Sequence, residues 1–137
     1  MQPTTKISIF GFRLAFVVLA IYWLAIFTGT HLPGIPRAVP LPNDKGMHFT
    51  AYFFLAVLMC YTTNSTRWIG RFTVIGATAM IYGAIDELTQ TFVPRRNPDL
   101  LDYAADVAGI WTAISLYAGA KYVHKTAALC TRNAKTL

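Results

Sequence analysis

Residues 82–109 read YGAIDELTQTFVPRRNPDLLDYAADVAG, and the rest of the chain is organised around this stretch. It lies between two runs that are apolar enough to span a membrane: residues 69–85 contain one charge, Arg71, and residues 110–120 contain none. Carboxylates at or just inside a hydrocarbon boundary cost free energy, and they usually mark a site rather than a surface. The stretch holds five of the six carboxylates in the chain, namely Asp86, Glu87, Asp99, Asp102 and Asp106.

The composition is that of a membrane protein rather than of an ordinary soluble domain. Of the 137 residues, 55% are hydrophobic and 13% are charged, whereas about 25% are charged in a typical globular chain. The net charge of +6 does not indicate a nucleic-acid surface, because Lys and Arg stand at the edges of apolar runs. The length allows one domain. Cys60 and Cys130 have no metal-ligand spacing and suggest no disulfide framework.

Four apolar segments each approach the roughly 20 residues that a spanning helix needs. We therefore expect an all-α integral membrane protein, a bundle of four transmembrane helices. The first segment is followed by no A-x-A-like cleavage site, so we expect it to be retained as a span. The proline-rich residues 29–43 should form a loop, Asn43 or Asp44 should cap the second helix, and Asn97, followed by Pro98, should cap the fourth. The expected spans are residues 7–28, 46–63, 69–93 and 103–123, within a single domain over residues 1–137.

The distribution of Lys and Arg predicts how these spans are oriented. Eight of these residues fall on the side of the two termini and the second loop, and four fall on the other side. By the positive-inside rule both termini are cytoplasmic, the basic tail of residues 124–137 included, and all six acids lie on the outer side. The eight are Lys6, Arg13, Arg67, Arg71, Lys121, Lys125, Arg132 and Lys135, and the four are Arg37, Lys45, Arg95 and Arg96.

Three of the expected helices carry a stripe of polar residues at helical spacing. The stripes lie at similar depth on the same membrane face, so we expect them to converge. Small residues four positions apart, Ala79 and Gly83 on the third helix and Ala105, Gly109 and Ala113 on the fourth, would let the helices approach closely. The stripes are Lys45, His48 and Tyr52; Tyr82, Asp86 and Gln90, with Glu87 beside them; and Asp99, Asp102 and Asp106.

The crowded carboxylates allow several chemistries. Desolvation and like charge would oppose full ionisation, which suits a proton donor or acceptor, or a site for a cationic headgroup or amine. The buried groups could instead only satisfy one another and fix the helix register. His48 with carboxylates could ligate a divalent metal, but no HxxxH or HExxH occurs, and we expect neither a metal nor a cofactor. Lys45, Arg95 and Arg96 could meet a lipid phosphate. We expect His31, in the proline-rich loop, to be solvated.

The order and spacing of these residues resemble the VanZ-like family. The resemblance covers residues 43–118, and its last block departs from the usual family form, which often has Asn at the position of Asp106. It implies a small multi-pass bacterial membrane protein of the cell envelope; the founding member is linked to teicoplanin resistance by a mechanism that is not established. The matching blocks are Asp44-Lys45-x-x-His48-x-x-x-Tyr52, then Asp86-Glu87-x-x-Gln90, then Arg96 and Asp102-x-x-x-Asp106-x-x-Gly109.

We therefore expect a multi-pass protein of the bacterial cytoplasmic membrane whose outward polar pocket binds a lipid or lipid-linked envelope molecule. Such binding would offer one route to altered glycopeptide susceptibility. Two alternatives stay open: a lipid-headgroup hydrolase or transferase with Glu87 or His48 as general base, and a structural protein whose cluster holds the helices together. No P-loop, Rossmann or nucleophile-elbow pattern indicates a standard enzyme class. The expected ligand-binding residues are Asp44, Lys45, His48, Tyr52, Asp86, Glu87, Gln90, Arg96, Asp102 and Asp106.

Overall fold

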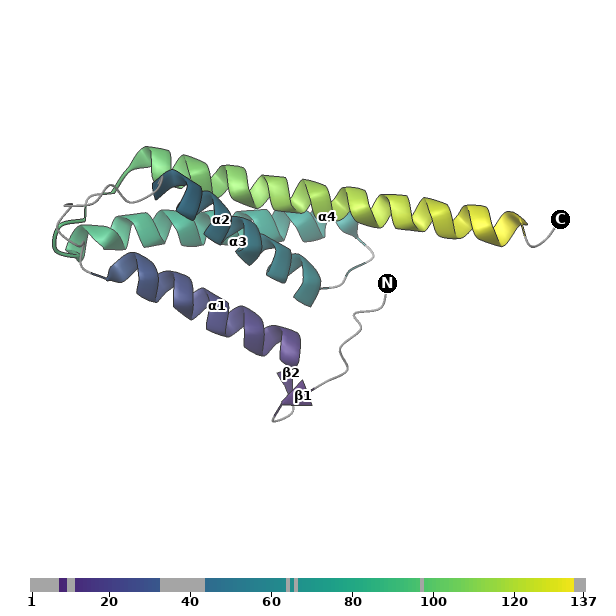
Figure 1. The fold of residues 1–137 in the computed structure, drawn as a ribbon, viewed down its shortest axis with the longest axis horizontal. Coiled ribbons are helices and arrows are strands. Elements are labelled where there is room, and N and C mark those ends of the chain that lie inside the picture. The colour runs from purple at the N-terminus through teal and green to yellow at the C-terminus, as the bar shows by residue number, and fades with distance from the viewer. Residues whose placement is uncertain are drawn as a thin grey trace.

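The computed structural model describes residues 8–9, 12–32, 44–63, 65, 67–96 and 98–134, and within them the chain is helical. Two strands of two residues each pair antiparallel ahead of the first helix. The all-helical fold and the number of helices agree with the sequence analysis. The elements are β1 (Ser8–Ile9), β2 (Phe12–Arg13), α1 (Leu14–His31), α2 (Asp44–Thr62), α3 (Trp68–Thr89), the 3-10 helix η1 (Gln90–Phe92) and α4 (Leu100–Ala134) (Figure 1).

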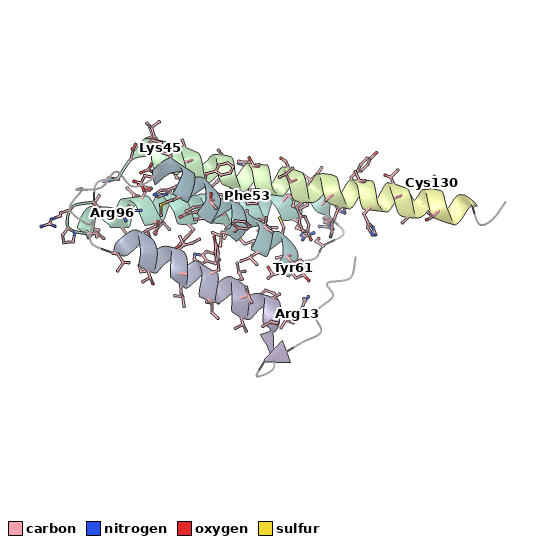
Figure 2. All side chains as sticks on the ribbon, viewed as in Figure 1. Arg13, Lys45, Phe53, Tyr61, Arg96 and Cys130 are labelled. Carbon is pink, nitrogen blue, oxygen red and sulfur yellow. The ribbon has the colours of Figure 1, made fainter. Side chains whose placement is uncertain are left out.

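The helices run up and down along one common direction (Figure 1). Helices α1 and α3 end where α2 and α4 begin, and α2 packs most extensively against α4. We call this end of the bundle, formed by residues 28–32, 44–52, 83–96 and 98–106, the polar end. Lys45 and Arg96 lie at the polar end, whereas Arg13 and Tyr61 lie at the other end, beyond which α4 projects (Figure 2).

Proline and a local hairpin set the ends of α1 and α3. The predicted span of residues 7–28 becomes a helix only from Leu14, because residues 8–9 and 12–13 pair as strands. The helix ends before Leu32, which is extended as expected for a residue that precedes proline. Helix α3 tightens into η1 as the chain approaches Pro94, so the regular part of the predicted 69–93 span is shorter than expected.

Helix α4 differs from its prediction at both ends. Its N-cap is Asp99, whose Oδ1 accepts a hydrogen bond from the Leu101 N–H at 2.8 Å. The predicted caps Asn97 and Asn43 lie outside the described residues, as does most of the proline-rich loop. At its far end α4 continues to Ala134 rather than stopping near Val123, because no proline or glycine follows Gly119.

The packed core lies between α2, α3 and α4, with α1 laid against it. Many large apolar side chains on all four helices remain exposed, for example Leu24, Phe54, Ile81 and Leu116, each about half exposed or more. Such an apolar exterior is typical of a chain that meets lipid or a partner. The largest members of the core cluster are Ile26, Tyr52, Leu55, Met59, Ile75, Ile110 and Ile114.

Among the described residues, two helices are long and apolar enough to cross a membrane, judged by length and composition: Leu14–His31, and Trp68–Phe92, which joins α3 and η1. Helices α2 and α4 do not meet this measure. Both carry charged and other polar residues along their length, among them Lys45 and His48 on α2 and Asp106 and Lys121 on α4. The expectation of four spanning helices is therefore supported only for α1 and α3.

Arg71 is the one charged residue in the apolar run of α3. It lies at the end of the bundle opposite the polar end, where it binds the end of α2. Its guanidinium is buried and donates to the backbone carbonyls of Cys60 and Thr63, and Nε donates to Thr63 Oγ1 at 3.1 Å. These bonds satisfy carbonyls that the end of α2 leaves without helical partners. The same guanidinium lies 5.6 Å from the ring centre of Tyr117 on α4.

Cys60 and Cys130 are both free thiols, in agreement with the sequence analysis, which suggested no disulfide framework.

Four of the five small residues predicted at the helix contacts are buried, whereas Ala105 is only partly buried. Ala79, Gly83 and Ala113 are almost fully enclosed, and at Gly109 the backbones of α2 and α4 lie close together. A Cβ atom at Gly109 would collide with the backbone carbonyl oxygen of Phe49 and lie 3.1 Å from a neighbouring backbone nitrogen. Backbone atoms cannot rotate away as side chains do, so the two helices would have to separate.

We predict that Gly109→Ala destabilises the protein, because separating α2 from α4 disturbs the largest helix contact. Overpacking of this kind costs about 1–3 kcal/mol. Thermal unfolding of the purified protein in detergent measures the effect. Gly119→Ala is the matched control on the same helix: its Cβ meets nothing within 4 Å, and alanine should stabilise a helix by roughly 0.5–1 kcal/mol. Equal melting temperatures for the two variants would contradict the close approach at Gly109.

Candidate functional site

The polar end contains one connected network of ionisable side chains, to which all four helices contribute. Gln90 links its two halves, since its Nε2 donates to Asp86 Oδ2 at 3.3 Å and to Glu87 Oε1 at 3.5 Å. One half joins Glu87 to α2 and α4, and the other joins Asp86 to α1. The convergence of three stripes predicted from helical spacing is therefore present, and α1 is an additional contributor.

His48 is the centre of the half between α2, α3 and α4. Its Nδ1 lies 3.0 Å from Asp106 Oδ1 and 3.8 Å from Glu87 Oε1, and all three side chains are buried. Glu87 Oε2 also accepts the backbone N–H of Asp99 at 3.1 Å, which ties the end of α3 to the start of α4. An imidazole between two buried carboxylates can exchange or share protons with them.

Lys45 pairs with two aspartates at the rim of the same network. Its Nζ donates to Asp99 Oδ2 at 3.0 Å and to Asp102 Oδ1 at 2.9 Å. The hydrogen bonds from Asp102 and Asp99 raise the pKa of Lys45. The Leu101 N–H, and then Lys45, lower the pKa of Asp99. Lys45 was expected to meet phosphate, but in this structure its charge is already neutralised by carboxylates.

Helix α1 contributes Thr30 and His31, which sequence reasoning missed. Thr30 Oγ1 donates to Asp86 Oδ1 at 2.9 Å, and His31 Nδ1 lies 3.7 Å from the same oxygen. His31 Nε2 also lies 2.9 Å from Thr89 Oγ1. The expectation that His31 is solvated in a loop is wrong: it belongs to the last turn of α1, and its side chain is 18% exposed. The available signal was a polar pair that ends an apolar helix shortly before the proline-rich segment leading to Lys45 and His48.

The remaining predicted residues divide between buried and exposed positions. Tyr52 is fully buried below the network, and within the described residues its hydroxyl has no hydrogen-bond partner; the same is true of Asp106 Oδ2 and Arg96 Nε. Asp44 is exposed in the first turn of α2, outside the buried network. Tyr82 faces α1, where its hydroxyl donates to the Trp23 carbonyl at 3.5 Å.

Carboxylates outnumber cations in this network. Burying several carboxylates with too few partners is costly, so the network needs protons, a bound cation or both. His48, Glu87 and Asp102 also offer ligand atoms that all lie within 4.8 Å of one another, which makes them the residues able to hold a metal ion. The acids are Asp86, Glu87, Asp99, Asp102 and Asp106, against Lys45, His31 and His48.

We predict that Asp99→Asn lowers stability at neutral pH and loses that effect in acid. Asparagine can still cap α4 but cannot pair with the Lys45 ammonium. Since the folded-state pKa of Asp99 is lowered, its contribution is present above its unfolded pKa of about 3.9 and disappears as pH falls through the folded value. Melting temperatures of wild type and variant in detergent should therefore differ at neutral pH and converge below pH about 4. A difference that stays constant with pH would contradict the ion pair.

Comparison with known proteins places this chain in a family. Residues 3–122 match the VanZ/LLP1 family. The chain is also similar to the Schizosaccharomyces pombe (strain 972) protein named "Uncharacterized protein C11E3.10", with 30% identity over 100 residues that cover 72% of this chain and 61% of the yeast protein. The chain thus matches less than two thirds of that relative's length. No solved structure matches the chain. The family match contains every residue of the polar end, and the chain belongs to the VanZ/LLP1 family.

Proposed function

We propose that this VanZ/LLP1 protein is a multi-pass protein of the bacterial cytoplasmic membrane that binds a lipid or lipid-linked molecule at the polar end. The observation that carries the proposal is the buried ionisable network, which lies at one end of a bundle with an apolar exterior. Asp86 and Asp106 are each 1% exposed, and Glu87 is 6% exposed. In a bilayer, this arrangement would put the network near the level of lipid headgroups, with both termini on the cytoplasmic side.

A groove on the outside of α3 and α4 supports a lipid as the ligand. It has a volume of about 360 Å³ and is lined by apolar side chains, among them Met80, Ile81 and Trp111. Its lining also includes Tyr103, the residue after Asp102 of the network. A lipid with its headgroup at the polar end would therefore find a place for an acyl chain along these helices. The phosphate would meet Arg96, whose Nε is buried and unpaired among the described residues.

Under this proposal, an effect on teicoplanin susceptibility would follow from the lipid or lipid-linked molecule held at the polar end. A deletion strain complemented with site variants tests that consequence.

One contact favours an enzyme as the second candidate. His48 Nδ1 lies 3.0 Å from Asp106, and this carboxylate–imidazole pair is the arrangement that orients a general base. Under this alternative His48, with Glu87 beside it, would activate water or a hydroxyl group toward a lipid headgroup. Turnover of a headgroup with a bell-shaped pH profile would favour the enzyme, whereas a binding protein gives no turnover.

We predict that a Glu87→Gln, His48→Ala double variant loses its bound lipid. Removing a buried charged contact costs about 1.5–3 kcal/mol, so lipid retention should fall by about tenfold or more. Native mass spectrometry of the protein purified in mild detergent measures the retained lipid. The control is His124→Ala, which removes a histidine from an exposed position on α4 and should retain the lipid.

Abundance in the membrane separates binding from a purely structural role. A double variant that accumulates and melts like wild type but retains no lipid supports the binding site. A double variant that retains as much lipid as wild type contradicts it. A variant that accumulates poorly while its surviving molecules keep the lipid would mean that the network only holds the helices together.

A further inference from the structure

We infer that the polar end is a binding site for one divalent metal ion, held by His48, Glu87 and Asp102. These residues come from α2, α3 and α4, all three are buried, and each offers a ligand atom within 4.8 Å of the other two. One imidazole nitrogen and two carboxylate oxygens from separate helices can surround a single ion. The site goes beyond lipid binding and does not depend on it.

Asp106 supplies an independent observation that points to a missing ligand. Its Oδ1 lies 3.0 Å from His48 Nδ1, but its Oδ2 is buried and has no hydrogen-bond partner among the described residues. This oxygen faces Gly83 of α3 and the ring of Tyr52, since a Cβ added at Gly83 would be 3.5 Å from it and 3.2 Å from that ring. An unpaired buried carboxylate oxygen is costly. A cation held by the neighbouring carboxylates would offset the charge of Asp106.

The contact between Asp106 and His48 also has the form found around bound metals. A metal-ligating histidine usually shares its other ring nitrogen with a carboxylate, which fixes the ring and raises its basicity. Asp106 contacts Nδ1 of His48, so the ion would be held by Nε2, and Asp106 would be a positioning residue. This role explains why a carboxylate is buried to 1% exposure beside a histidine rather than beside an arginine or lysine.

The charge balance favours a divalent ion over a proton alone. Glu87, Asp102 and Asp106 bring three carboxylates together, and the nearest ammonium, Lys45, is shared with Asp99. A divalent ion would offset two of these charges in the buried region. It would also present positive charge to a phosphate, which the paired Lys45 does not.

The donor set selects among metals. An imidazole suits Zn²⁺ and other transition metals, whereas carboxylates suit Mn²⁺ and Mg²⁺ as well, so a mixed set favours Zn²⁺ or Mn²⁺ over Mg²⁺. Ligand atoms about 2.1 Å from a tetrahedral ion lie about 3.4 Å apart. The atoms of the three residues lie within 4.8 Å of one another, so the most distant pair must approach by about 1 Å or more when an ion binds.

The test is metal binding to the purified full-length chain in detergent, stripped with EDTA and titrated separately with Zn²⁺, Mn²⁺ and Mg²⁺. We expect about one ion per chain by elemental analysis, with calorimetry ranking Zn²⁺ or Mn²⁺ above Mg²⁺, and an increase in melting temperature on binding. Asp106→Asn keeps the shape of the side chain and should weaken binding 10–100-fold. Glu87→Gln should weaken it at least as much.

Two controls make the outcome decisive. Tyr122→Ala and His124→Ala change exposed residues of α4 and should leave affinity unchanged; an equal loss in these variants would show adventitious binding and overturn the site. Wild type that binds no more ion than folded Asp106→Asn or Glu87→Gln would overturn it as well. Native mass spectrometry with EDTA separates the two proposals. If the protein takes up no ions but still retains lipid, the metal site is wrong and the lipid proposal stands. If the protein takes up ions but retains no lipid, the lipid proposal is wrong and the metal site stands.

Discussion

The burial of ionisable side chains at the polar end is the constraint on which the rest of the structure depends. Asp86 and Asp106 sit on different helices at 1% exposure, so each must find donors from a neighbouring helix. Asp86 accepts hydrogen bonds from Thr30 of α1 and from Gln90, and Asp106 is hydrogen-bonded to His48 of α2. These contacts fix the rotation and relative height of the helices, because a shift of one residue would leave a carboxylate buried and unpaired.

The two ends of the bundle satisfy this constraint differently. At the far end, Arg71 donates to the last carbonyls of α2 and lies against Tyr117, so its polar atoms are matched within the protein. At the polar end carboxylates are in excess, and Asp106 Oδ2 is left without a partner among the described residues. The middle of the bundle is held by apolar contacts and by the close approach at Gly109. This asymmetry explains why function is assigned to the polar end alone.

The geometry changes the roles of individual residues at the polar end. Lys45 is held between Asp99 and Asp102, which makes it part of the scaffold rather than a free anion receptor. Asp44, next to it in the sequence, is exposed and makes no part of the network. Helix α1 supplies Thr30 and His31 to Asp86, so a segment predicted only as a retained span also helps to build the site.

The sequence by itself determined the helical fold, the family and the three polar stripes, because helical periodicity and apolar run lengths are local properties. Only the tertiary structure decided which carboxylate pairs with which cation, that His31 reaches Asp86, and that His48, Glu87 and Asp102 lie close together. Those facts depend on distances between residues up to 58 positions apart, set by helix packing that no local pattern encodes.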